Sequence, residues 1–190
     1  EGNRVHAAYV SNFSGQNEVY YARFDYALNI QDLDCVSAGW PGCDSYPDMW
    51  PCIAVTDNSS INIFYTHDLP NGDPIYESWT GDGAASWGIT TDLFLSGGSD
   101  MTCPEACLFY YGGDRRVMVV CDGRAANGFH KIYFSRFYDG NWNEKGEKLG
   151  NLGPDDAAGS KNGYPQIDYD GSRLMVVYRN SGGSAGQEGQ

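Results

Sequence analysis

The sequence predicts an all-β protein built from repeated antiparallel units, and three observations support this prediction. Short apolar runs rich in Val, Ile and Tyr recur along the chain, separated by turns rich in Gly, Asn and Asp. No stretch shows sustained helical periodicity, so no long helix is expected. The runs repeat in groups with a period of roughly 50 to 60 residues, which indicates a repeat architecture.

Each group contains strands of four kinds, named here by their order within the unit. The second strands carry apolar residues at both odd and even positions, typical of burial on both faces; they are Arg4–Val10, Ile61–Tyr65, Arg116–Cys121 and Arg173–Tyr178. Third strands follow at Glu18–Arg23, Pro74–Ser78 and Lys131–Ser135. First strands begin at a proline, at Pro51–Val55, Pro104–Tyr110 and Pro165–Tyr169. Weaker fourth strands are expected at about Asp32–Ser37, Ile89–Leu95 and Glu147–Asn151.

A repeated four-stranded antiparallel meander is the signature of a β-propeller blade. We therefore expect about thirteen strands in about three and a half blades. The blades divide the chain into residues 1–47 (partial), 48–99, 100–162 and 163–190 (partial). Because ring closure normally needs four or more blades, we expect part of a larger propeller, or a chain that completes one with other copies.

Charge and composition exclude several classes of partner. The chain has 12 Lys and Arg against 25 Asp and Glu, and its net charge of −13 repels phosphate backbones, so nucleic acid is not expected. No apolar run approaches the roughly 20 residues of a membrane span, and the N-terminus has no basic-then-apolar signal pattern. Because the sequence starts at Glu1 without a Met, a processed chain or a fragment is expected.

The cysteines and two sequons indicate a secreted or cell-surface protein. The six cysteines include no C-x-x-C pair, so zinc-binding spacings are absent and a disulfide framework is the better interpretation. Among the fifteen connectivities, the expected pairs are Cys107–Cys121, Cys52–Cys103 and Cys35–Cys43. Asn12 and Asn58 begin N-x-S sequons and are expected glycosylation sites.

The turn after the third strand of the middle unit carries a motif. Residues 80–87 read Thr-Gly-Asp-Gly-Ala-Ala-Ser-Trp. This segment resembles the Asp-box (BNR) repeat of sialidase-like propellers, whose pattern is Ser/Thr-x-Asp-x-Gly-x-Thr/Ser-Trp between the third and fourth strands of a blade. Ala84 replaces the usual Gly, and the next unit holds a degenerate copy with a displaced Asp.

The chemistry of this motif points to a structural role. An Asp in such a turn accepts hydrogen bonds from nearby backbone N–H groups, and the Trp packs its apolar face between strands. We therefore interpret the residues of both copies as blade staples: Thr80, Asp82, Trp87, Ser135, Asp139 and Trp142.

The resemblance also implies a set of sialidase residues, namely an arginine triad, a tyrosine–glutamate pair and an aspartate acid. None of these can be placed residue by residue. Arginines lie at the ends of second strands, where they are typical of solvated edge residues; they are Arg4, Arg116, Arg173 and Arg179. Sialidase activity is therefore not expected from this segment.

Two aspartates are the best-placed candidates for chemistry. The segments that begin at Asp48 (Asp-Met-Trp-Pro-Cys) and Asp100 (Asp-Met-Thr-Cys-Pro) align without gaps, and both lead into an innermost strand. Two carboxylates there would form an acid/base pair or bind a cation such as calcium; the alternative is that each caps its own turn. The histidines lie in different units without metal-binding spacing, so no role is expected for them: His6, His67 and His130.

Three aromatic residues form the second candidate site. Trp40, Tyr46 and Trp50 lie in a loop rich in Gly, Pro and Cys that leads into an innermost strand. Exposed rings of this kind stack on sugar faces, whereas buried ones would fill the gap between blades.

Together these features predict a disulfide-stabilised extracellular module that binds glycan or protein, or forms surface structure, without catalysis. One alternative is a fragment of a sialidase-like glycoside hydrolase. Another is a structural component that self-associates when a neighbouring copy adds a strand to the incomplete blade. No cofactor is expected, and calcium is the one ion considered.

Overall fold

The computed structural model is all-β throughout the part of the chain that it describes. Thirteen strands account for all its regular structure there. Among those residues, no helix is long and apolar enough to cross a membrane. The described residues are 4–13, 15–37, 46–56, 59–70, 72–91, 93–94, 99–124, 130–149 and 162–180.

The strands form four antiparallel sheets in chain order. The first sheet holds β1 (Val5–Ser11), β2 (Glu18–Phe24) and β3 (Ile30–Cys35). The second holds β4 (Asp48–Val55), β5 (Ile61–His67), β6 (Ile75–Thr80) and β7 (Gly88–Thr90). The third holds β8 (Ser99–Tyr111), β9 (Asp114–Arg124), β10 (His130–Tyr138) and β11 (Asn141–Lys148). The fourth pairs β12 (Asn162–Tyr169) with β13 (Leu174–Asn180).

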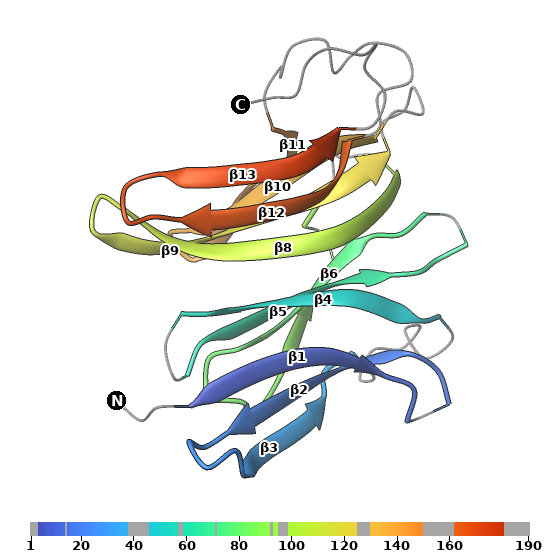
Figure 1. Ribbon diagram of the computed structural model, residues 1–190, viewed down its shortest axis with the longest axis vertical. Helices are drawn as coiled ribbons and strands as arrows, with labels where there is room; N and C mark the ends of the chain where they lie inside the picture. Colours follow the sequence, from blue (N-terminus) through green and yellow to red (C-terminus); the bar gives the residue numbers. More distant parts are fainter. Residues whose placement is uncertain are drawn as a thin grey trace.

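The sheets stack face to face along the long axis of the molecule (Figure 1). Strand β1 lies against β4, β4 lies beside β8, and β8 lies beside β12. We call β4, β8 and β12 the inner strands, because each begins its own sheet and contacts the first strand of the sheet before it. All three begin on the same side of the stack, at the right in Figure 1.

Apolar side chains fill each space between neighbouring sheets. Between the second and third sheets, Phe64 packs in one cluster with Val117 and Val119 of β9. On the opposite face of β9, Met118 and Val120 pack toward the fourth sheet. The second strands β5 and β9 are therefore buried on both faces, as predicted. The same prediction is wrong for β1 and β13, which lie in the first and last sheets and expose Val5 and Val177.

The predicted all-β fold with four-stranded antiparallel sheets is confirmed. The fourth strand β7 ends at Thr90, short of the predicted Leu95. The fourth strand β11 begins at Asn141, whereas the prediction placed its start at Glu147. The cause is a two-residue hairpin: Asp139 and Gly140 both have positive φ, and Tyr138 pairs directly with Asn141. Closure of the sheets into a propeller ring stays a prediction.

The five described cysteines are free thiols, and Cys43 lies outside the described residues. The predicted Cys107–Cys121 bond is wrong because the ladder pairs Cys107 with Met118. Met118 packs toward the fourth sheet and Cys121 toward the second, so the two cysteines lie on opposite faces of the third sheet. The predicted Cys52–Cys103 bond is likewise not formed.

Candidate functional site

The Asp-box turn lies between β6 and β7, and its carboxylate is satisfied within the turn. Thr80 Oγ1 donates to Asp82 Oδ1 at 2.6 Å, and Ser86 donates its backbone N–H to Oδ1 and its hydroxyl to Oδ2. The hydrogen bonds from Ser86 and Thr80 lower the pKa of Asp82 to about 2. These contacts occupy the carboxylate and fit a structural staple.

The tryptophans of the two motif copies tie each sheet to the one before it. Trp87 Nε1 donates to Asp34 Oδ2 at 3.3 Å, across to the first sheet. Trp142 Nε1 donates to Glu77 Oε2 at 2.8 Å, across to the second sheet. In the degenerate copy, Asp139 lies instead at the hairpin tip between β10 and β11.

Two serines repeat a second inter-sheet bond. Ser78 Oγ donates to the carbonyl of Val36 at 2.7 Å, and Ser135 Oγ donates to the carbonyl of Leu93 at 2.6 Å. Each serine ends an Ile-Tyr-x-Ser segment of a third strand. That shared tetrapeptide is the sequence signal for this contact. Ser135, which was predicted to belong to the degenerate Asp-box turn, thus donates to the carbonyl of Leu93 next to the second sheet and not to a group of its own turn.

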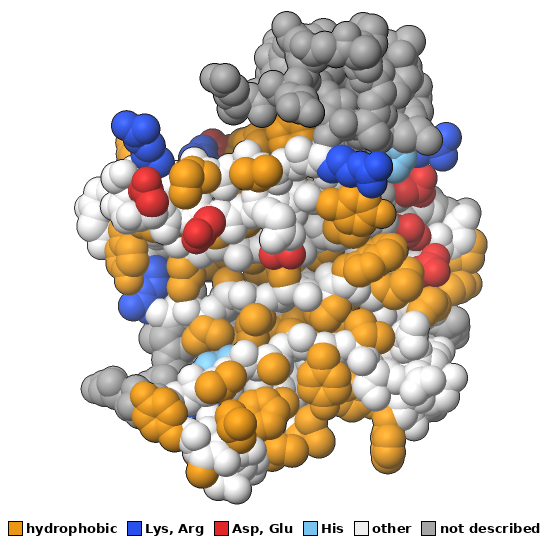
Figure 2. Space-filling view, viewed as in Figure 1, with side chains coloured by type: hydrophobic (Ala, Val, Ile, Leu, Met, Phe, Trp, Pro, Cys, Tyr) orange, Lys and Arg blue, Asp and Glu red, His pale blue; other side chains and the backbone are white. Residues whose placement is uncertain are grey.

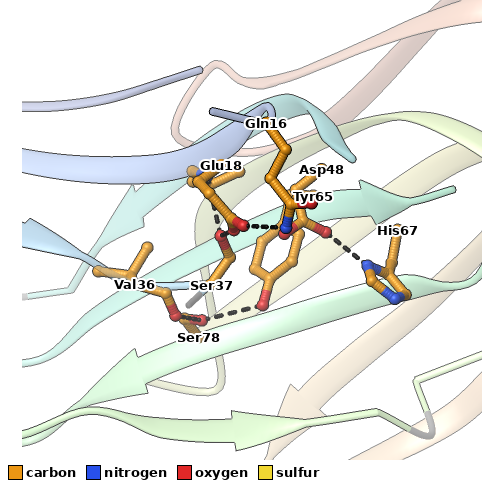
Figure 3. Close-up of polar contacts among 9 residues, drawn as sticks. Gln16, Glu18, Val36, Ser37, Asp48, Tyr65, His67 and Ser78 are labelled. Atoms are coloured by element: carbon orange, nitrogen blue, oxygen red, sulfur yellow. Dashed lines mark hydrogen bonds and ion pairs between the residues drawn. The ribbon is translucent and has the colours of Figure 1, made fainter. Parts of the chain in front are cut away.

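Asp48 lies in a buried polar cluster between the first and second sheets (Figure 3). Its Oδ1 is 2.7 Å from His67 Nδ1, and its Oδ2 has no hydrogen-bond partner of normal geometry in the described part of the chain. The ring of His67 stacks on Tyr76, and Tyr46 meets it edge-on. Asp48 is thus sealed from solvent.

A second buried carboxylate completes the cluster. Glu18 accepts a 2.5 Å hydrogen bond from Ser37 Oγ and a 2.6 Å bond from Gln16 Nε2 (Figure 3). Desolvation by burial raises the pKa of Asp48, and the nearby Glu18 charge adds to that rise. The structure therefore places Asp48 in the core between two sheets and not in an accessible cleft.

Asp100 lies in different surroundings. Its Oδ2 is 3.6 Å from Arg124 Nη1, and both side chains are partly exposed. Burial, together with the charges of Asp68 and Asp100, raises the pKa of Asp73 nearby. The structure does not bring Asp48 and Asp100 together as a pair: their partners are His67 and Arg124, respectively.

Each inner strand carries a β-bulge at one equivalent position. Trp50 in β4, Cys103 in β8 and Tyr164 in β12 have φ of 50°, 51° and 53°. Each directly precedes a proline and lies where the ladder shifts register. We call these three residues the inner-strand bulges; non-glycine residues with positive φ are strained and tend to lie at functional sites.

The bulges also correct the alignment of the two aspartate segments. Superposing Trp50-Pro on Cys103-Pro makes Asp48 equivalent to Met101, and both of these side chains are buried. Asp100 then lies one residue earlier, at a further bulge of β8 with φ of 54°. Because side chains alternate between the faces of a strand, a shift of one residue changes the surroundings completely.

Two of the bulges present aromatic rings to solvent. Trp50 is 47% exposed and Tyr164 is 65% exposed. Figure 2 shows apolar side chains spread over the face on which the inner strands lie, with acidic, basic and histidine side chains close together on its right-hand side. That is the side on which the inner strands begin.

An Asp–His pair that sequence reasoning missed lies beside the third bulge. Asp122 Oδ1 is 3.0 Å from His130 Nδ1, and a Cβ added to Gly163 would lie 3.0 Å from Asp122 Oδ2. Burial raises the pKa of Asp122, opposed by His130. No sequence motif marks this pair; its only signal is that Asp122 directly follows the predicted second strand Arg116–Cys121 and His130 directly precedes the predicted third strand Lys131–Ser135.

The remaining predicted residues are placed as follows. Tyr46 is partly buried against His67, and Asn12 is exposed. Trp40 and Asn58 lie outside the described residues. Within those residues, no group of three or more His, Cys, Asp or Glu side chains is arranged to hold a metal ion.

Comparisons with known proteins relate the chain to others by its fold. No family model matches the sequence, and no curated protein matches it. Among solved structures, the chain is similar to the catalytic domain of a GH62 alpha-L-arabinofuranosidase from Coprinopsis cinerea, with a TM-score of 0.52 and 13% identity. The match covers 99% of this chain and 70% of that one. At this identity the likeness shows the fold alone.

Proposed function

We propose that this chain is a carbohydrate-binding, β-propeller-like module of an extracellular protein, and that its ligand stacks on Trp50 and Tyr164. The observation that carries the proposal is the pair of exposed aromatic rings held at equivalent bulges of two inner strands. Bulges re-aim side chains and fix them on rigid strands, and rigid rings lose little entropy on binding.

Polar side chains near the start of the inner strands support a sugar ligand. An aromatic face covers the apolar C–H face of a sugar ring, while ring hydroxyls need hydrogen-bonding groups at the edge of the site. Asp100, Arg124 and His130 supply such groups where the inner strands begin. The solved structure with a similar fold is a glycoside-processing domain, which agrees with this class of ligand.

Binding measurements on single variants test this proposal. A glycan array identifies a ligand for the wild-type chain, and titration then compares Trp50→Ala and Tyr164→Ala with it. We expect each variant to weaken binding about tenfold or more, as for a central aromatic anchor. The matched control is Trp79→Ala, because Trp79 is 45% exposed on β6, away from the inner strands. Unchanged affinity in both inner-strand variants contradicts the proposal.

A glycoside hydrolase is the second candidate, and one observation favours it. Burial raises the pKa of Asp122, whereas Asp100 on the neighbouring strand faces Arg124. Carboxyl groups in such different surroundings are what glycosidases use as acid and base. Asp48, fully buried, is the poorer candidate.

Turnover of aryl glycosides, including an aryl α-L-arabinofuranoside, tests this candidate. An active chain should lose turnover by at least a hundredfold in Asp122→Asn, while its affinity for the substrate is kept. Absence of turnover by the wild-type chain over the whole substrate panel rejects catalysis and leaves the binding proposal intact.

A further inference from the structure

A bulge in the ladder between β8 and β9 brings two cysteines near each other without pairing them directly. Thr102 pairs with Asp122, and Glu105 pairs with Val120. The bulge between these two pairs leaves Cys103 and Pro104 together opposite Cys121. Residues directly opposite on antiparallel strands have Cα atoms about 4.5 to 5.5 Å apart, which lies inside the span of a disulfide.

The third nearby cysteine is less well placed for a bond. Cys52 packs against the same apolar cluster as Cys121, but it lies on β4 of the second sheet, where it pairs with Phe64. Stacked sheets are separated by about 10 Å, more than a disulfide spans without backbone movement. The geometry therefore favours a bond within the third sheet over one between sheets.

The two thiols differ in access. Cys121 is fully buried, and its Sγ donates to the Met101 sulfur at 3.7 Å. Cys103 is partly exposed, at the central inner-strand bulge. Burial raises the pKa of both thiols, so each is protonated at neutral pH and reacts slowly there.

We propose that Cys103 and Cys121 are a redox pair that closes into a cross-strand disulfide, while Cys52 remains a thiol. With glutathione disulfide as the oxidant, the Cys103 thiolate attacks one glutathione sulfur and releases the first glutathione thiolate. The Cys121 thiolate then attacks Cys103 Sγ and releases the second. The two protein thiols give up two electrons and two protons, and one glutathione disulfide becomes two glutathione thiols.

The bond would join the backbone at the central bulge, between the bulges that carry Trp50 and Tyr164. The evidence for this bond is the register of β8 against β9, so the proposal does not depend on carbohydrate binding. A cross-link between these strands restricts the unfolded chain, so the oxidised protein should melt at a higher temperature than the reduced one.

Peptide mapping of the full chain tests the pair. The protein is equilibrated over a series of glutathione and glutathione disulfide ratios at pH 8, its free thiols are alkylated, and it is digested without reduction. We expect one linked peptide pair containing Cys103 and Cys121, with Cys52 alkylated throughout. The oxidation rate should rise with pH, because more of the Cys103 thiol is then ionised.

Single variants separate the outcomes. Cys103→Ser replaces a partly exposed thiol, so it should fold and abolish the linked pair; Cys107→Ser on the same strand is the control that should leave the pair unchanged. A linked peptide joining Cys52 to Cys103 or to Cys121 overturns the proposal. So does full alkylation of Cys103 and Cys121 at the most oxidising ratio.

Discussion

Trp142 shows how one side chain ties two sheets together. Its ring packs edge-on against Phe64 and Phe137, and its Nε1–H donates to the buried carboxylate of Glu77. Asn62 donates to the other oxygen of that carboxylate at 2.7 Å. An acidic group in an apolar interior is tolerated when both oxygens are satisfied in this way.

Removing the indole N–H while keeping an aromatic ring tests this contact. Trp142→Phe should destabilise the protein by about 1 to 3 kcal/mol, because one buried carboxylate oxygen loses its donor. Chemical denaturation, with the slope m unchanged, measures the loss. The control Trp79→Phe should change stability by less than about 0.5 kcal/mol. Equal effects of the two substitutions would show that the hydrogen bond contributes nothing.

Asp82 makes stability depend on pH in a definite direction. The folded-state pKa of Asp82 is about 2, below the value of about 3.9 for an unfolded Asp. Its contribution is therefore complete above about pH 4 and is lost as the pH falls toward 2. Thermal melting should show Asp82→Asn below wild type at pH 7, with the gap closing toward pH 2. A gap that stays constant over this range contradicts the assignment.

Turns and bulges decide where each strand presents its side chains. The Asp-box pattern has Gly at the position of Ala84, and the structure gives the reason: Ala84 adopts a φ of 76°. L-residues other than Gly are strained in this region. Ala84 therefore introduces local backbone strain into a turn whose hydrogen bonds are otherwise satisfied.

Relieving that strain should stabilise the protein. We expect Ala84→Gly to add about 0.5 to 1 kcal/mol, the left-handed strain removed less the extra freedom of Gly in the unfolded chain. The control in the same turn, Ala85→Gly, has no left-handed φ to relieve and should be neutral or destabilising. Urea midpoints measured side by side decide between these outcomes.

The two inter-sheet serines, Ser78 and Ser135, also depend on how their strands are positioned. Ser135 Oγ donates to the Leu93 carbonyl and accepts the backbone N–H of Gly146 at 3.0 Å. Ser78 Oγ donates to the Val36 carbonyl. Both are buried, so Ser→Ala at either position should cost about 1 to 3 kcal/mol. A loss at only one position would show that the two bonds are not equivalent.

In the molecule as a whole, the strands of the first and last sheets expose large apolar side chains. Met175 and Val177 on β13 are 46% and 70% exposed, and β1 is mostly exposed or partly exposed. Apolar strand faces of this kind favour association with another copy or with further sheets. The alternative function, in which the chain is a structural component that self-associates, depends on these exposed side chains.

Measurement of mass against concentration tests that alternative. We expect the wild-type chain to form larger species as its concentration rises, and Val177→Lys to shift the molecule toward a monomer at the same concentration. The control Trp79→Lys alters an exposed apolar residue on β6, outside β1 and β13. A wild-type chain that stays monomeric at every concentration rejects self-association.

Much of the fold could be predicted because strand periodicity is local. The β9 run with apolar residues at both parities predicts a strand between two layers, and Val117 and Met118 indeed face different sheets. The start of β11 was missed because a two-residue turn with positive φ at Asp139 depends on backbone conformation, which composition does not specify.

The candidate site was predicted only in part, for the same reason. Trp50 was selected from the sequence as an exposed ring, and the structure exposes it. Tyr164 and Asp122 were missed, because bulges and sheet stacking relate them to Trp50, which lies 114 residues before Tyr164 and 72 residues before Asp122 in the sequence. Asp48 and Asp100 do not form a pair, because a further bulge in β8 shifts Asp100 away from the position equivalent to Asp48. An alignment without gaps does not show this bulge.

The all-β class, the repeat and most strand positions could therefore be predicted from the amino-acid sequence. These follow from side-chain periodicity and turn chemistry over a few residues. The three-dimensional arrangement was needed to show which side chains share a face, why Asp48 is buried while Asp100 is not, and which cysteines lie near each other. Side chains alternate with every residue, so each bulge reverses the faces that follow it, and only the register of neighbouring strands reveals where that happens.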